Sequence, residues 1–172
     1  MTTPPFGPVS ASDIAIVSAQ LQRPARDVIG IAARCVCGAP TVVATRPRLT
    51  DGTPFPTLYY LTCPRAAAAV GRLEASGLMR AMTDRLRTDA DLADRYASAH
   101  RSYLARRAEL GHVEEIDDVS AGGMPTRVKC LHVLVAHALA AGSGVNPLGD
   151  EALALMPPWW TDGPCVAPEA SA

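Results

Sequence analysis

Residues 54–64, PFPTLYYLTCP, mark the point where this sequence changes from strand to helix. The segment up to Thr62 is rich in aromatic and β-branched residues and predicts a strand. Pro64 suits the first position of a helix, because its ring fixes φ and its missing N–H is not needed there. Cys63 is therefore expected at or next to the N-cap of that helix. We expect a sheet before this stretch and helices after it.

Two further strands are predicted upstream. Residues 28–35 (VIGIAARC) and 41–45 (TVVAT) are apolar and partly β-branched, and the turn residues between them indicate a hairpin. Ahead of the hairpin, Ser10 and Asp13 are typical of a helix start, and Pro24 ends the apolar run that follows. The N-terminal third is therefore predicted to hold a short helix and a small antiparallel sheet.

Downstream of Pro64, apolar residues recur at spacings of three and four, which indicates helices. We therefore predict an α+β fold in which the small sheet packs against a helical layer of four to five helices. The predicted helical segments are residues 64–75, 78–86, 89–110, 126–141 and 150–155.

The length of 172 residues suits one domain. We expect this domain to span residues 10–165. Residues 1–9 hold three prolines without a periodic pattern, so they are expected to form a disordered tail. A second disordered tail is expected over residues 166–172.

The charge pattern gives no reason to expect nucleic acid as a partner, because 16 basic and 17 acidic residues nearly balance. No segment reaches the roughly 20 apolar residues of a membrane-spanning helix, so no membrane contact is expected. The N-terminus lacks the basic and apolar regions of a signal peptide. We therefore expect a cytoplasmic location, where cysteines stay reduced.

The five cysteines carry the most chemical information. Cys35 ends a predicted strand, Cys37 lies in the next turn, Cys63 lies at a strand-to-helix junction, and Cys130 stands two residues before His132. Thiolates and imidazoles brought together from such element ends can bind zinc or an iron–sulfur cluster. Two other readings stay open, which are a reactive thiol and ordinary packing of a small apolar side chain.

The pair Cys130 and His132 sets a geometric condition. Residues two apart in a regular helix point about 200° apart, so these two can share a site only if Cys130 precedes the first turn. His137 lies almost two turns further along and is expected in the core or behind the site. Cys37 and Cys165 have no clear place in a ligand set.

Several phrases together resemble one family, the bacterial domain of unknown function 501 (DUF501) family. The resemblance extends over about residues 12–165, and the composition, rich in alanine, arginine and proline, looks actinobacterial. The phrases are Arg34-Cys35, residues 54–64, residues 129–132 (KCLH) and residues 144–151 (GVNPLGDE).

The resemblance implies little about activity, because the family has no established one. Its motifs map onto Cys35, Cys63, Cys130 and His132, which implies that these four are the ligands of zinc or an iron–sulfur cluster. Family members are often encoded beside a septum-formation protein and an exopolyphosphatase, which hints at cell division or polyphosphate metabolism.

Two alternative functions stay open. The first is a thiol-dependent enzyme with Cys63 or Cys130 as nucleophile and His132 or His137 as base. The second is a non-catalytic binding module, in which the Trp159-Trp160 end or the acidic connection of residues 111–124 contacts an unknown protein partner.

Overall fold

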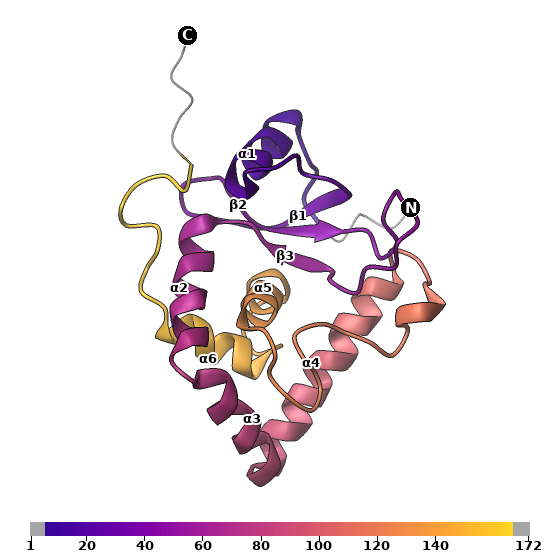
Figure 1. The fold of residues 1–172 in the computed structure, drawn as a ribbon, viewed down its shortest axis with the longest axis vertical. Helices are drawn as coiled ribbons and strands as arrows, with labels where there is room; N and C mark the ends of the chain where they lie inside the picture. Colours follow the sequence, from indigo (N-terminus) through magenta and orange to yellow (C-terminus); the bar gives the residue numbers. More distant parts are fainter. Residues whose placement is uncertain (1–5, 167–172) are drawn as a thin grey trace.

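The computed structural model describes residues 6–166 and confirms the α+β fold. A three-stranded antiparallel sheet of order β1-β2-β3 lies in the N-terminal part, and the described residues form six α-helices (Figure 1). The elements in chain order are α1 (Ala11–Leu21), β1 (Val28–Arg34), β2 (Pro40–Thr45), β3 (Tyr59–Leu61), α2 (Pro64–Ala75), α3 (Leu78–Thr88), α4 (Ala90–Ala108), the 3₁₀ helix η1 (Glu114–Ile116), α5 (Leu131–Ala141) and α6 (Pro147–Leu155).

Both faces of the sheet are covered, with α1 on one side and α5 on the other (Figure 1). Successive side chains of a strand point to opposite faces of the sheet. Neighbouring residues of the central strand β2 therefore pack into two different cores. Val42 and Ala44 belong to the large core shared with the helices. Val43 instead joins Ile31 and Val17 of α1 in a small second core.

The loop that leads into β3 is anchored on α4. The backbone N–H of Leu58 donates to the hydroxyl of buried Tyr103 at 2.6 Å. The guanidinium of buried Arg107 donates to the carbonyls of Pro56 at 3.0 Å and Val119 at 2.6 Å, and also to that of Ile116. These bonds join β3, α4 and the acidic connection.

Two predicted elements are shorter in the structure. Of residues 54–62, only Tyr59–Leu61 pair with β2, since Pro54 and Pro56 have no N–H to donate to a ladder. In the apolar segment 126–141, the helix α5 begins only at Leu131. The preceding residues form turns, with Gly122 and Gly123 at φ of 71° and 93°.

The sequence stretch expected to be a disordered tail lies partly within the described residues. There, Gly7 exchanges both backbone hydrogen bonds with Ile31 of β1, at 3.1 and 3.0 Å. Residues 1–5 and 167–172 lie outside the described residues, so the expectations for them stay expectations. Among the helices that the structure describes, none has both the length and the hydropathy that crossing a membrane requires.

Candidate functional site

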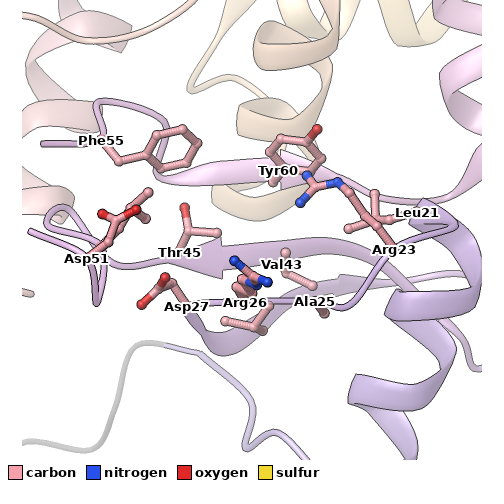
Figure 2. Close-up of a pocket in the computed structure, with 12 residues that line it drawn as sticks. Leu21, Arg23, Ala25, Arg26, Asp27, Val43, Thr45, Asp51, Phe55 and Tyr60 are labelled. Atoms are coloured by element: carbon pink, nitrogen blue, oxygen red, sulfur yellow. The ribbon is translucent and has the colours of Figure 1, made fainter. Parts of the chain in front are cut away.

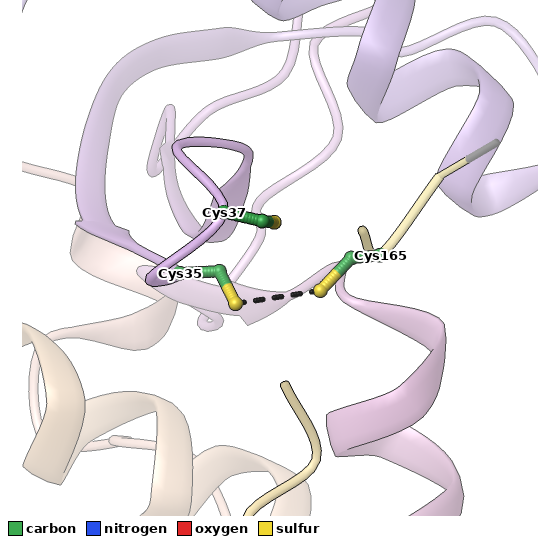
Figure 3. Close-up of side chains that lie close together, drawn as sticks. All are labelled: Cys35, Cys37 and Cys165. Carbon is green, nitrogen blue, oxygen red and sulfur yellow. Dashed lines mark hydrogen bonds between the residues drawn. The ribbon is translucent and has the colours of Figure 1, made fainter. Parts of the chain in front are cut away.

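Three cysteines from opposite ends of the chain meet beside the β1–β2 hairpin. The Sγ atoms of Cys35, Cys37 and Cys165 all lie within 4.8 Å of one another. Figure 3 shows the sulfurs of Cys35 and Cys165 pointing toward each other, and they are 3.4 Å apart. Cys35 and Cys165 are buried, whereas Cys37 is exposed. All five cysteines of the chain are free thiols.

A tight hairpin turn puts Cys35 and Cys37 together. The N–H of Gly38 donates to the carbonyl of Cys35 at 2.8 Å, and the N–H of Cys35 donates to that of Ala39 at 2.9 Å. Gly38 has a φ of 86°, a conformation that glycine adopts without steric cost. The C-terminal segment that brings Cys165 is tied to α2, because Arg65 donates to the carbonyl of Gly163 at 3.0 Å.

Cys63 is a fourth sulfur next to this group. It is the N-cap of α2, as predicted from Pro64, and its side chain is fully buried. Burial raises the pKa of the Cys165 thiol, and close contact with the thiols of Cys63, Cys35 and Cys37 raises it further. Cys165 therefore stands among three other sulfurs.

Cys37, the exposed member of the group, has a lowered pKa. Burial alone would raise the pKa of the Cys37 thiol. Hydrogen bonds from the backbone of Cys165 and Ala39, and then from the thiols of Cys165 and Cys35, outweigh burial and lower this pKa to about 7. The group therefore carries thiolate character near neutral pH, which is the form that binds metals.

A second group joins Cys130 and His132 to Glu74 of α2. One ligand atom from each of the three lies within 4.8 Å of the others. Cys130 is the N-cap of α5 and so precedes its first turn, which was the condition for sharing a site with His132. The Nδ1 of His132 lies 3.1 Å from Oε1 of Glu74, and its Nε2 lies 3.2 Å from the carbonyl oxygen of Ala67.

These contacts set the charge of His132. A carboxylate and a carbonyl oxygen both accept hydrogen bonds, so a proton is needed on each ring nitrogen to satisfy both. The hydrogen bond with Cys130, followed by the bond with Glu74, raises the pKa of His132 to about 9 against the opposing effect of burial. His132 is therefore an imidazolium at neutral pH.

His137 lies in the core. Its ring stacks on Tyr59 with centroids 5.6 Å apart, and its Nδ1 lies 3.2 Å from the side-chain nitrogen of Asn146. Burial lowers the pKa of His137 to about 4, so the ring is neutral and packs among aromatic side chains.

The residues expected as one ligand set fall into different groups. Cys35 belongs to the three-cysteine group and Cys63 adjoins it, whereas Cys130 and His132 lie with Glu74. Sequence reasoning left Cys37 and Cys165 without a place, although the Cys-x-Cys spacing was a weak signal for the first. Nothing local in the sequence pointed to Glu74, which only the packing of α2 on α5 brings to the site.

Two hollows flank Cys130. A groove of about 560 Å³ is lined by Cys130, His132, the start of α2 and the residues of β3. On the other side, a hollow of about 480 Å³ is lined by Cys130, Arg127, Lys129 and the turn of residues 119–124. Cys130 therefore borders both spaces.

A third pocket, of about 250 Å³, lies between the end of α1 and the sheet. Figure 2 shows the two arginines and two aspartates around it, Arg23, Arg26, Asp27 and Asp51. Since these charges balance, the pocket has no preference for a ligand of one sign.

A family model described as a protein of unknown function (DUF501) matches residues 31–154, more than half of the chain. No curated protein and no solved structure matches the chain. The matched range includes both members of the Cys-x-Cys pair, Cys63 and the whole second group, while Cys165 lies beyond it.

Proposed function

The chain belongs to the DUF501 family, whose function is unknown, and we propose that it binds one zinc ion through Cys35, Cys37, Cys63 and Cys165. The observation that carries this proposal is the meeting of three sulfurs, two from the hairpin and one from the C-terminal segment, within 4.8 Å. Cys63 is the fourth ligand in this proposal, since its thiol adjoins that of Cys165, although it stands outside the three sulfurs that all lie within 4.8 Å of one another.

The spacing of the sulfurs suits a single ion. Tetrahedral zinc with Zn–S bonds of about 2.3 Å places its ligand sulfurs about 3.8 Å apart. The separation of 3.4 Å between Cys35 and Cys165, and the limit of 4.8 Å for the group, bracket this value. A cluster of several iron atoms would need more room between the sulfurs. Four thiolates also close the coordination sphere, which is typical of a structural site.

This ligand set keeps Cys35 and Cys63 from the sequence-based set and replaces Cys130 and His132 by Cys37 and Cys165. The second group has the residue types to hold a metal ion. However, both nitrogens of His132 contact acceptors, so neither offers a lone pair to a cation. The donor set of Cys35, Cys37, Cys63 and Cys165 has no such obstacle, and its thiols are compatible with a reducing cytoplasm.

The proposed role of the ion is to connect three segments. It would join the β1–β2 turn, the residue that directly precedes α2 and the segment around residue 165 to one another. We expect the metal to stabilise the fold, since ligands that meet only in the folded chain make binding energy part of folding energy.

Elemental analysis of the protein purified under reducing conditions tests the proposal. We expect about one zinc per chain, and we expect Cys37→Ser and Cys165→Ser to lose most of it. Cys130→Ser is the matched control and should keep the zinc. A protein without stoichiometric metal, or equal loss in the control, would refute the ligand set.

A further inference from the structure

Cys130 lies at the junction of two hollows of different chemistry. The groove on one side, here called the uncharged groove, contains no charged side chain among the described residues except His132. Its other lining residues are apolar or neutral, and they include Leu61, Ala67 and Val133 beside Gln20. Such a surface suits an uncharged, largely apolar group.

The hollow on the other side, here called the cationic hollow, is lined by Arg127 and Lys129. No acidic residue lines it within the described part of the chain, and neither cation forms an ion pair with a described residue. The rest of the lining comes from the turn of Gly122 and Gly123 and its neighbours. Two unpaired cations beside a glycine turn suit a phosphate group.

The segment that carries Cys130 is held from several sides. The N–H of Leu131 donates to Glu74 at 2.7 Å, and the N–H of Val128 donates to the hydroxyl of Thr83 at 3.0 Å. The hydroxyl of Tyr96 donates to the carbonyl of Arg127 at 3.1 Å. The glycine turn packs closely against the same segment, because a Cβ on Gly123 would come within 2.7 Å of the carbonyl oxygen of Arg127. The sulfur therefore has a fixed position between the two hollows.

We propose that Cys130 is a nucleophile that accepts an acyl group from donors with a phosphate-bearing leaving group. The acyl group lies in the uncharged groove and the phosphate lies in the cationic hollow. His132 is the proton donor to the leaving group through its Nε2–H, which exchanges the carbonyl of Ala67 for the leaving group when the donor binds. Glu74 is a positioning residue that holds Nδ1 of the imidazolium. The geometry supports this assignment, because Cys130 precedes the first turn of α5 and its Sγ lies within 4.8 Å of a ring nitrogen of His132.

The reaction is balanced without any further reactant except water. The Cys130 thiolate attacks the acyl carbonyl carbon, so a C–S bond forms while the bond from that carbon to the leaving group breaks. The leaving group departs with the electron pair and takes a proton from the His132 imidazolium. Water then attacks the acyl–cysteine, neutral His132 accepts its proton, and a carboxylic acid leaves as the thiolate is restored.

Acetyl phosphate and acetyl-coenzyme A test the proposal, because each carries a small acyl group on a phosphate-bearing leaving group. The full-length, metal-loaded protein is incubated with each donor, and acetyl adducts are located by peptide mass spectrometry. We expect an adduct on Cys130 from at least one donor. An adduct from acetyl phosphate identifies phosphate itself as the leaving group, and one from acetyl-coenzyme A identifies a phosphorylated thiol. If neither donor acetylates Cys130, the proposal is overturned.

Variants separate a built site from chance acetylation. Replacing both Arg127 and Lys129 with Gln should slow acetylation at Cys130 about tenfold or more, because it removes the attraction for the donor's phosphate. His132→Gln should slow it about 100-fold, the scale of general acid catalysis. Unchanged rates in these variants would overturn the proposal.

Iodoacetamide gives a second readout that needs no acyl donor. Cys130 should be alkylated faster than the other thiols of the zinc-loaded protein, and His132→Gln and Glu74→Gln should slow this reaction. His112→Gln is the control, since it replaces an exposed histidine that lines neither hollow and should leave alkylation of Cys130 unchanged. Thermal unfolding of each variant checks that it is folded. Slow alkylation of Cys130 in the folded wild type would contradict the nucleophile assignment.

Discussion

At the scale of single residues, His132 is defined by its two acceptors. The carboxylate of Glu74 and the carbonyl of Ala67 contact the two ring nitrogens. The hydrogen bond with Cys130, and then the bond with Glu74, raise the pKa of His132 to about 9. The imidazole pKa of an unfolded chain is about 6.5. This histidine therefore adds stability that is fully present below pH 6.5 and is lost as the pH rises through about 9.

A pH titration followed by NMR checks this directly. We predict that the ring resonances of His132 titrate near pH 9 in the wild type and at a lower pH in Glu74→Gln, which removes the negative charge but keeps the shape. Titration near pH 6.5 in both proteins would show that Glu74 does not hold the proton on this ring.

Arg107 is a buried cation that is stabilised by hydrogen bonds to backbone carbonyls. Its guanidinium donates to three carbonyl oxygens, those of Pro56, Val119 and Ile116. We predict that Arg107→Met lowers the free energy of unfolding by about 3 kcal/mol, because carbonyls that are left buried lose their donors. Urea denaturation provides the measurement. The neighbouring change Arg106→Met removes an exposed pair with Glu109 and should cost less than about 0.5 kcal/mol. Similar losses in both variants would contradict this account.

At the scale of elements, the contact of α6 with α5 depends on one glycine. Asn146 caps α6, and its side chain accepts from the N–H of Gly149 at 2.9 Å. A Cβ at Gly149 would clash with the backbone carbonyl of Leu134 and lie 2.9 Å from the Cβ of Ala138. The close approach explains why a glycine stands inside this short helix, where it otherwise weakens the structure.

The matched glycine of α2 makes this testable. We predict that Gly149→Ala lowers the free energy of unfolding by about 2 kcal/mol, because two packed helices must move apart. Gly71→Ala meets no atom within 4 Å and should raise stability by up to about 1 kcal/mol through helix propensity. Thermal or urea unfolding of both variants decides the point. A neutral Gly149→Ala would mean that the two helices do not pack this closely.

The elements also show which parts of the fold were predictable. The N-cap position of Cys63 followed from a local signal, namely Pro64 directly after it. Such signals act over one turn of helix and can be read directly. The N-cap position of Cys130 was only a condition for a site shared with His132, because the predicted helical segment began at residue 126. The boundary at Leu131 was missed, because residues 126–130 (TRVKC) were joined to the apolar run that follows them, and nothing local in them revealed the turns that precede the helix.

At the scale of the whole molecule, the candidate sites depend on contacts that no local pattern encodes. Cys165 reaches Cys35 only because the C-terminal segment returns along α2 to the hairpin (Figure 1). Glu74 reaches His132 only because α2 packs on α5. The residue types were therefore visible in the sequence, but their grouping required the tertiary arrangement.

The proposed zinc ion makes a prediction at the same scale. Removal of the metal by a chelator should lower the melting temperature and increase amide hydrogen exchange in the β1–β2 turn, at the start of α2 and around residue 165. Exchange in the middle of α5 should change much less. If exchange rises uniformly, or not at all, the ion does not fasten these three segments.

The ligands themselves can be observed by X-ray absorption at the zinc edge on the purified protein. The proposed site predicts four sulfur neighbours at about 2.3 Å and no nitrogen or oxygen ligand. The zinc signal should be largely lost in Cys37→Ser, which is expected to bind little zinc, and should stay unchanged in His132→Gln. A spectrum with imidazole or carboxylate ligands, or one that changes on loss of His132, would contradict the four-thiolate centre.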